Sequence, residues 1–228
     1  NPMKYQSNNL FIEGVKAQNL AKRFKTPMYC YSYEKLKKNI INFRNSFKSF
    51  SPLICFSVKA NSNVNLLREI KKFNCGADVV SIGEMMKVLK AGFNPKKVVF
   101  SGVGKTFEEL SYAINKKILL INIESEEELI EVEKIAKKKR KVVDIGIRLN
   151  PNTDAKTLKK ISTGKKENKF GVTEKAFFNL LNYSKKSKYL NLKCLSVHIG
   201  SQITSYKPYE KTLGIIKKII HKSNYKFQ

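Results

Sequence analysis

Residues 52–61 have the sequence PLICFSVKAN, an apolar run that ends at Lys59. The run is rich in aromatic and β-branched residues, which predicts a strand buried on both faces. Lys59 would then emerge at the carboxyl end of this strand. Because α/β proteins carry their functional residues at the carboxyl ends of strands, the stretch predicts such a fold with Lys59 close to a site.

Two interpretations of Lys59 follow from its position. The simpler one is a side chain that extends its ammonium group to water along an apolar surface. The more specific one is an amine nucleophile, because desolvation near a buried strand favours the neutral amine, which condenses with an aldehyde to give a Schiff base. This stretch alone favours the simpler interpretation.

Length and composition limit the class of protein. With 228 residues and 42% hydrophobic content, the chain suits one large α/β domain. No run reaches the ~18 apolar residues of a membrane span, and residues 1–6 lack the apolar core of a signal peptide. The four cysteines are widely spaced, which favours reduced thiols, and only two histidines are present as further metal ligands. We expect a cytoplasmic protein without a metal site or membrane contact.

The formal net charge of +27 raises the alternative of a basic protein that binds nucleic acid. The lysines, however, are spread along predicted helix faces, and the densest run, residues 137–141, lies at a helix end where cations suit the helix dipole. No combined aromatic and basic pattern accompanies the charge. The nucleic-acid hypothesis therefore rests on charge alone, and we expect no such partner.

Short apolar runs alternate with amphipathic segments from residue 28 onward, which predicts βαβ units and a parallel sheet. The predicted strands cover residues 28–31, 53–58, 77–80, 97–101, 118–123, 142–149 and 192–199. The predicted helices cover residues 33–48, 63–73, 82–91, 106–115, 125–139, 173–186 and 207–222. Residues 1–25 precede the alternation, so we divide the chain into an N-terminal segment, 1–27, and an α/β domain, 28–228.

Local signals agree with these boundaries. Three predicted helices begin with the spacing of a capping box, at Ser81/Glu84, Thr106/Glu109 and Ser125/Glu128. Residues 101–106, SGVGKT, follow a strand as a phosphate-binding loop would, but the first glycine of that motif is replaced by Val99. The segment is better explained as a glycine-rich loop before a helix cap, and a nucleotide triphosphatase is disfavoured.

Seven segments together resemble the diaminopimelate decarboxylases. They have the family's order and spacing from about residue 10 onward: VKAN at 58–61, GADVVSIGE at 76–84, FSGVGKT at 100–106, IESE at 123–126, RLNP at 148–151, KFGV at 169–172 and HIGSQI at 198–203. The first segment alone is shared with ornithine and arginine decarboxylases and alanine racemase. HIGSQI and KFGV are typical of the diaminopimelate branch.

The resemblance implies a (β/α)8 barrel that binds pyridoxal 5′-phosphate, followed by a β domain against which residues 1–27 would pack. Lys59 matches the lysine that forms a Schiff base with the cofactor, and His198 matches the imidazole that stacks on its ring. The phosphate contacts match Ser201 and the backbone of Gly200. Two further polar residues of the cofactor pocket match Asp78 and Arg148.

The resemblance also implies the activity, which is decarboxylation of meso-2,6-diaminopimelate to L-lysine by a homodimer. Bound pyridoxal phosphate accepts the electron pair left by carbon dioxide, and the Lys59 amine could then assist proton transfer. Two alternatives stay open. One is a related decarboxylase acting on ornithine, arginine or carboxynorspermidine, and the other is a non-catalytic module that binds the cofactor.

Two departures from the family pattern limit the resemblance. Residues 157–164, TLKKISTG, stand where the family commonly has THPYISTG. The sequence given also ends at residue 228, after about six predicted barrel strands. We therefore expect an N-terminal portion of the enzyme with an incomplete barrel and no C-terminal β domain. Its outer strands would be unpaired, so it would be inactive alone and prone to associate.

Overall fold

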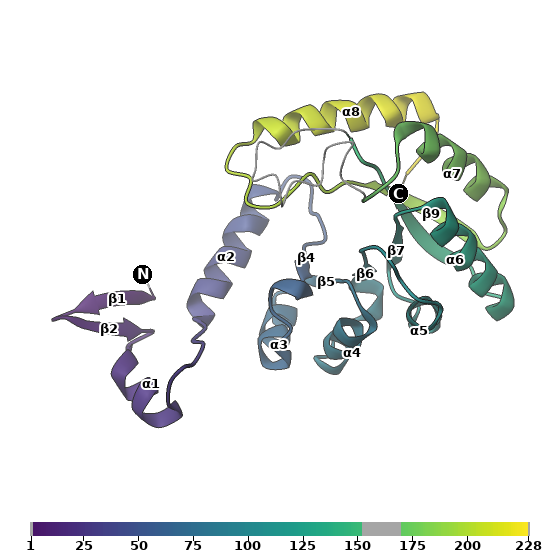
Figure 1. Ribbon diagram of the computed structural model, residues 1–228. Coiled ribbons are helices and arrows are strands. Elements are labelled where there is room, and N and C mark those ends of the chain that lie inside the picture. The colour runs from purple at the N-terminus through teal and green to yellow at the C-terminus, as the bar shows by residue number, and fades with distance from the viewer. Residues whose placement is uncertain (1, 152–169, 228) are drawn as a thin grey trace.

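The computed structural model describes residues 2–151 and 170–227. Its centre is a six-stranded parallel sheet in which every strand pairs with its neighbours in chain order (Figure 1). The strands are β4 (Cys55–Ser57), β5 (Gly76–Val79), β6 (Val98–Phe100), β7 (Leu120–Ile123), β8 (Val143–Arg148) and β9 (Leu190–Ser196). This confirms the predicted α/β fold with an incomplete barrel of six strands.

Helices connect the strands, as the alternation of the sequence predicts. They are α2 (Tyr33–Ser46), α3 (Val64–Lys72), α4 (Ile82–Lys90), α5 (Phe107–Lys116), α6 (Glu126–Lys139), α7 (Glu174–Lys186) and α8 (Lys207–Ser223), with short 3₁₀ turns η1 (Val58–Ala60) and η2 (Pro95–Lys97). Each predicted helix is present with its ends within two residues of the expected ones. None of the helices in the described ranges combines the length and the apolar character that crossing a membrane would require.

The three predicted capping boxes differ in detail. The first hydroxyl of each pair, on Ser81, Thr106 and Ser125, accepts the backbone N–H three residues later. Only Thr106 and Glu109 complete the reciprocal bond. The other two glutamates, Glu84 and Glu128, accept the N–H of the residue before the cap. These carboxylates thus fasten the strand-to-helix loop as well as the helix.

The expectation of a long buried strand before Lys59 is wrong. β4 contains three half-buried residues, and Leu53 is exposed. β4 pairs with β5 and with no other strand of the described sheet, so it is covered less than an inner strand. The chain then turns through η1, which leaves Lys59 exposed rather than desolvated at a buried strand end.

The N-terminal segment forms a separate small sheet. Three antiparallel strands, β1 (Met3–Gln6), β2 (Asn9–Ile12) and β3 (Val15–Lys16), precede helix α1 (Ala17–Phe24). This unit lies to one side of the large sheet, beyond α2 (Figure 1). None of residues 2–31 is buried. The strand predicted at 28–31 is absent, because this stretch has no sheet partner and links α1 to α2.

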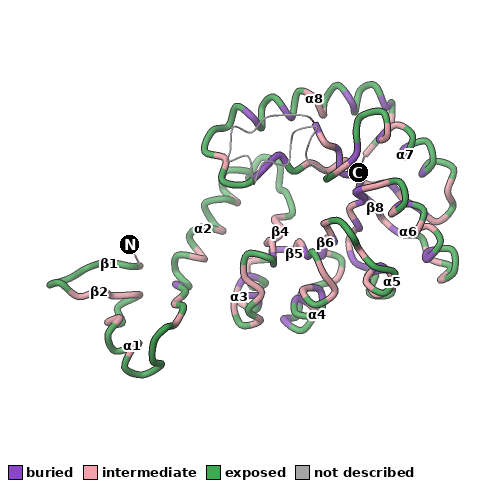
Figure 2. Tube along the Cα trace, in the orientation of Figure 1, coloured by how far each residue is buried: buried purple, intermediate pink, exposed green. Residues whose placement is uncertain are grey.

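The core lies between the sheet and the helices that cover its outer face (Figure 2). In β8, Val143, Ile145 and Ile147 are buried in this core. The residues that alternate with them, Gly146 and Arg148 among others, point to the opposite face. Alternation of this kind separates an apolar outer face from a polar inner face, and the inner face carries the candidate site.

Two glycines give a matched test of how closely the strands pack. A Cβ atom on Gly76 would lie 2.4 Å from the backbone oxygen of Lys97 and 2.7 Å from the Sγ atom of Cys55, whereas one on Gly214 would meet nothing within 4 Å. Gly76→Ala should therefore lower the free energy of unfolding by roughly 1–3 kcal/mol. The control Gly214→Ala, in α8, should raise it by about 0.5–1 kcal/mol. Urea denaturation of both variants measures the difference, and a neutral Gly76→Ala would contradict the packing described.

Candidate functional site

A cavity of about 890 Å³ lies at the carboxyl ends of the strands. All six residues singled out in the sequence line it: Lys59, Asp78, Arg148, His198, Gly200 and Ser201. They come from the ends of four strands, β4, β5, β8 and β9, that are far apart in the sequence. The remaining lining residues are Ser57, Val80, Ser101, Gly102, Val103, Asn122, Phe170, Ser196 and Val197.

Strand register brings these side chains together. Ser57 is paired with Asp78 across β4 and β5, and Arg148 is paired with Ser196 across β8 and β9. Parallel strands place their carboxyl ends at one edge, so each pair contributes to the same inner surface. The segment after β9 then adds His198, with Gly200 following at a φ of +141°, a backbone conformation that favours glycine.

Three polar side chains form a hydrogen-bonded row along the cavity floor. Asn122 Nδ2 donates to Ser101 Oγ over 2.9 Å, and Ser101 Oγ donates to Asp78 Oδ1 over 2.5 Å. Burial raises the pKa of Asp78, while the Ser101 hydrogen bond and the nearby Lys59 and Arg148 charges lower it, and burial outweighs them. The row orients Asp78 on the Lys59 side of the cavity.

Arg148 is held on the opposite side by a buried ion pair. Its Nη1 atom lies 2.9 Å and 3.1 Å from the two carboxylate oxygens of Glu124, and both side chains are almost fully buried. The guanidinium also lies 5.5 Å from the centre of the Phe170 ring. Gly171, at a φ of +81°, passes so close to Arg148 that a Cβ atom would lie 2.9 Å from its backbone oxygen. The FGV part of the KFGV segment therefore packs against Arg148.

Three buried polar atoms in the cavity have no hydrogen-bond partner within the described part of the chain. They are Asn122 Oδ1, Arg148 Nη2 and Ser196 Oγ, and the only other such side-chain atom in that part is on Ser184. An unpartnered buried polar atom carries a desolvation cost, so their gathering here indicates a surface that binds a polar ligand. Arg148 and Ser196 supply donors, which suits a ligand rich in oxygen atoms.

His198 is exposed to the cavity, and its pKa is lowered from 6.5. Desolvation by the cavity wall is the main cause, and the positive charges of Arg148 and Lys59 act in the same direction. The imidazole ring is thus predominantly neutral at pH 7. A neutral ring can lie against an aromatic ligand without adding positive charge to it.

Sequence reasoning missed five residues of this arrangement: Ser57, Ser101, Asn122, Glu124 and Ser196. A signal was available for Asn122, which is the one polar residue in the strand sequence LINI. The two serines at the ends of β4 and β9 also follow apolar runs. Glu124 was quoted within IESE but given no role, because a glutamate after a strand is usually at the surface.

The glycine-rich loop 101–106 does not leave its lysine available to a phosphate. The side chain of Lys105 is 1% exposed and donates to the backbone oxygens of Gly102 and Asn122 over 2.6 and 2.8 Å. It also forms an ion pair with Glu128. Lys105 therefore fastens the loop to β7 and α6. The other departure from the family pattern, residues 157–164, lies outside the described residues.

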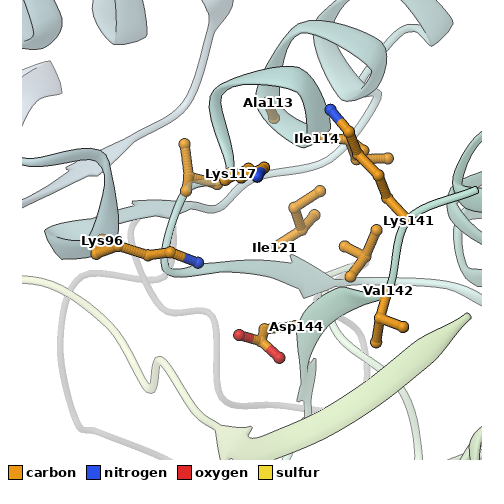
Figure 3. A pocket seen from close by; sticks show the side chains of 10 residues that line it. Lys96, Ala113, Ile114, Lys117, Ile121, Lys141, Val142 and Asp144 are labelled. Carbon is orange, nitrogen blue, oxygen red and sulfur yellow. The ribbon is translucent and has the colours of Figure 1, made fainter. Parts of the chain in front are cut away.

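A second, smaller cavity of about 270 Å³ lies at the amino ends of β6, β7 and β8 (Figure 3). Lys96, Lys117 and Lys141 surround its aliphatic wall, with Asp144 below. Lysine and arginine make up 45 of 228 residues, so three lysines among ten lining residues is close to what composition alone provides. No unpartnered buried atom of the described residues lines this cavity. It does not compete with the larger cavity as a site.

The electrostatics of the larger cavity can be tested through His198. In the folded protein His198 should titrate below pH 6.5, and Arg148→Gln should move its pKa upward because a nearby positive charge is removed. Since the folded pKa is below the unfolded one, the folded state should lose stability as the pH falls from about 6.5 toward the folded value. NMR titration of the imidazole resonances measures this, with His198→Gln to assign the signal. An unchanged His198 pKa in Arg148→Gln would contradict the electrostatic interaction between the two side chains.

Residues 33–227 match the family model described as "Pyridoxal-dependent decarboxylase, pyridoxal binding domain". The diaminopimelate decarboxylase of Helicobacter pylori strain J99 is 44% identical over 202 residues, which cover 89% of this chain and 50% of that protein. The chain thus spans about half the length of the curated relatives it matches.

Solved structures agree with the sequence comparison. The structure of diaminopimelate decarboxylase from Helicobacter pylori complexed with L-lysine has a TM-score of 0.88 at 42% identity, and the match covers 90% of this chain and 52% of that one. The enzyme from M. jannaschii in co-complex with L-lysine gives a TM-score of 0.91 at 31% identity over 100% of this chain and 55% of that one. The chain therefore belongs to the pyridoxal-dependent decarboxylases and carries their pyridoxal-binding domain.

Proposed function

We propose that this chain is the cofactor-binding half of a diaminopimelate decarboxylase, which converts meso-2,6-diaminopimelate to L-lysine. The observation that carries the proposal is the cavity at the strand ends. It gathers a lysine, a carboxylate, an arginine and an imidazole with three unpartnered buried polar atoms. The relatives' names supply the substrate, because the diaminopimelate decarboxylases of Helicobacter pylori and M. jannaschii align at 44% and 31% identity over most of the chain.

The residues of the cavity fit pyridoxal phosphate. Lys59 would hold the aldehyde carbon through its amine, and the exposed position of Lys59 leaves this amine accessible to it. Ser201 and the backbone of Gly200 would hold the phosphate, and His198 would lie against the ring. Asp78, Ser196 and the free Nη2 of Arg148 are available for the remaining polar groups. When bound, the cofactor accepts the electron pair that carbon dioxide leaves behind.

The chain's own residues would orient the reactants and move protons. Asp78, whose pKa is raised, is fixed by Ser101 and lies close enough to Lys59 for the two charges to interact. The Lys59 amine, when it is not bonded to the cofactor, would be a candidate to give or take a proton at the reacting carbon. Arg148 would place a fixed positive charge opposite, where it favours anionic groups.

The alternatives have less support. A related decarboxylase of ornithine, arginine or carboxynorspermidine would share the fold and Lys59, but the solved arginine decarboxylase aligns at 22% identity, which shows the fold alone. A non-catalytic module that binds pyridoxal phosphate would share the cofactor contacts, but the relatives that align at 44% and 31% identity are decarboxylases by name. A nucleic-acid-binding role still rests on the charge of +27 alone.

The proposal extends to organisation and location. Residues 1–27 would pack with a β domain of the complete enzyme, since the segment has no buried residue of its own. Exposed aromatic residues there, among them Tyr5, Phe24 and Tyr29, give it an apolar surface to cover. The enzyme would act as a homodimer in the cytoplasm, which suits four free cysteines.

The substrate can be tested with a panel of amino acids. The complete protein, loaded with pyridoxal phosphate, should release carbon dioxide from meso-diaminopimelate and at least about tenfold less from ornithine or arginine at equal concentration, since a site built for one polar end group discriminates strongly. Lys59→Arg, which keeps the charge but not the reactive amine, is the control and should be inactive. Preferred release from ornithine or arginine would overturn the diaminopimelate assignment.

A further inference from the structure

We propose that Glu124 is a positioning residue that sets the geometry of Arg148 in the cavity and thereby strengthens cofactor binding. The inference rests on the proposed function, because it takes pyridoxal phosphate as the ligand that Arg148 meets. Glu124 does not itself line the cavity. It would act entirely through Arg148 and the adjacent glycine loop.

The ion pair leaves one nitrogen of Arg148 unused. Both carboxylate oxygens of Glu124 contact the same atom, Nη1, at 2.9 and 3.1 Å. A pairing built for stability alone would engage two guanidinium nitrogens side by side. Here Nη2 has no partner within the described residues, although it is buried. Glu124 therefore fixes the guanidinium through one terminal nitrogen, and the other, enclosed and without a partner among the described residues, is a donor that a ligand reaching it would satisfy.

Glu124 also forms hydrogen bonds with Gly102 and Glu128. Glu124 accepts a hydrogen bond of 3.1 Å from the backbone N–H of Gly102, a cavity-lining residue, and its own N–H donates to Glu128 over 2.9 Å. Glu128 in turn pairs with the buried amine of Lys105. Each carboxylate of this row is compensated by its own cation, Glu124 by Arg148 and Glu128 by Lys105, in a poorly hydrated region, although the two carboxylates are neighbours. The Gly102 N–H restricts the Glu124 carboxylate, as a positioning residue requires, whereas Glu128 contacts only the backbone of Glu124.

Position also argues for a role beyond folding. Glu124 follows β7 directly and Arg148 ends β8, so the pair joins two adjacent strands at the cavity edge rather than in the apolar core. The central carbon of the same guanidinium lies over the Phe170 ring, 5.5 Å from its centre. Glu124 and Phe170 together restrict Arg148 to one orientation. A restricted donor binds an oxygen-rich ligand more tightly because less freedom is lost on binding.

A double-mutant cycle on pyridoxal phosphate affinity tests the proposal. The complete apoprotein is titrated with the cofactor, and the dissociation constant is followed by absorbance and by protein fluorescence. Glu124→Gln keeps the shape but removes the charge, and it should weaken affinity roughly tenfold, the scale of a lost charge-assisted hydrogen bond. In an Arg148→Gln background, the same change should have no further effect, because the residue it positions is gone.

Two further variants separate positioning from folding. Glu128→Gln, in the same buried row but without contact to a cavity-lining side chain, should lower the melting temperature while leaving the affinity within about twofold of the unchanged protein. Glu124→Asp shortens the side chain but keeps the negative charge that balances Arg148. It is therefore the variant to use if Glu124→Gln does not fold. It should weaken affinity by a smaller factor, again only when Arg148 is present.

Each outcome is decisive. The positioning role would be overturned if Glu124→Gln lowered the cofactor affinity by the same factor with and without Arg148. Glu124→Asp takes its place in this comparison if Glu124→Gln does not fold. An equal loss of affinity in Glu128→Gln would do the same, since it would assign the effect to the fold. If the unchanged protein failed to bind pyridoxal phosphate at all, the proposed function would fail instead, and the two failures are thus distinguishable.

Discussion

Parallel pairing of six short strands is the constraint on which the site depends. In a parallel sheet all carboxyl ends lie at one edge, so residues that are distant in sequence become neighbours there. Register completes the arrangement by setting Ser57 beside Asp78 and Arg148 beside Ser196. Helices on the outer face bury the alternate residues and hold the sheet in place. The cavity is therefore a direct consequence of strand order and of the period of two along each strand.

Buried charges gather in and beside the loops at the carboxyl edge of the sheet, and the protein accommodates them in pairs. Arg148 is matched by Glu124, and Lys105 by Glu128, with all four side chains nearly buried. Buried pairs of this kind contribute little net stability, because desolvation offsets much of their attraction. Their value here lies in fixed geometry. Of the four buried side-chain atoms without a hydrogen-bond partner among the described residues, three belong to residues that line the cavity, Arg148, Asn122 and Ser196.

The sequence predicted the helices, the six parallel strands and all six residues chosen for the cavity. Strict alternation and capping signals account for the first two, since both are local properties. The sequence-based predictions were wrong where strand pairing and burial by distant parts of the chain decide the local structure. Residues 28–31 have strand composition but no partner strand, and Lys59 is exposed because β4 pairs on one side only. No role was predicted for Glu124, because its ion pair with Arg148 joins residues that only the fold brings together.

The central claim is that Lys59, among many lysines, carries the cofactor. Incubation with pyridoxal phosphate, reduction with sodium borohydride and peptide mapping by mass spectrometry test it directly, because reduction fixes the bond between the reacting amine and the aldehyde carbon. The account predicts a single modified residue, Lys59, and no modified peptide after Lys59→Ala. Modification spread over surface lysines, or retained at another site such as Lys105 in the Lys59→Ala variant, would contradict it.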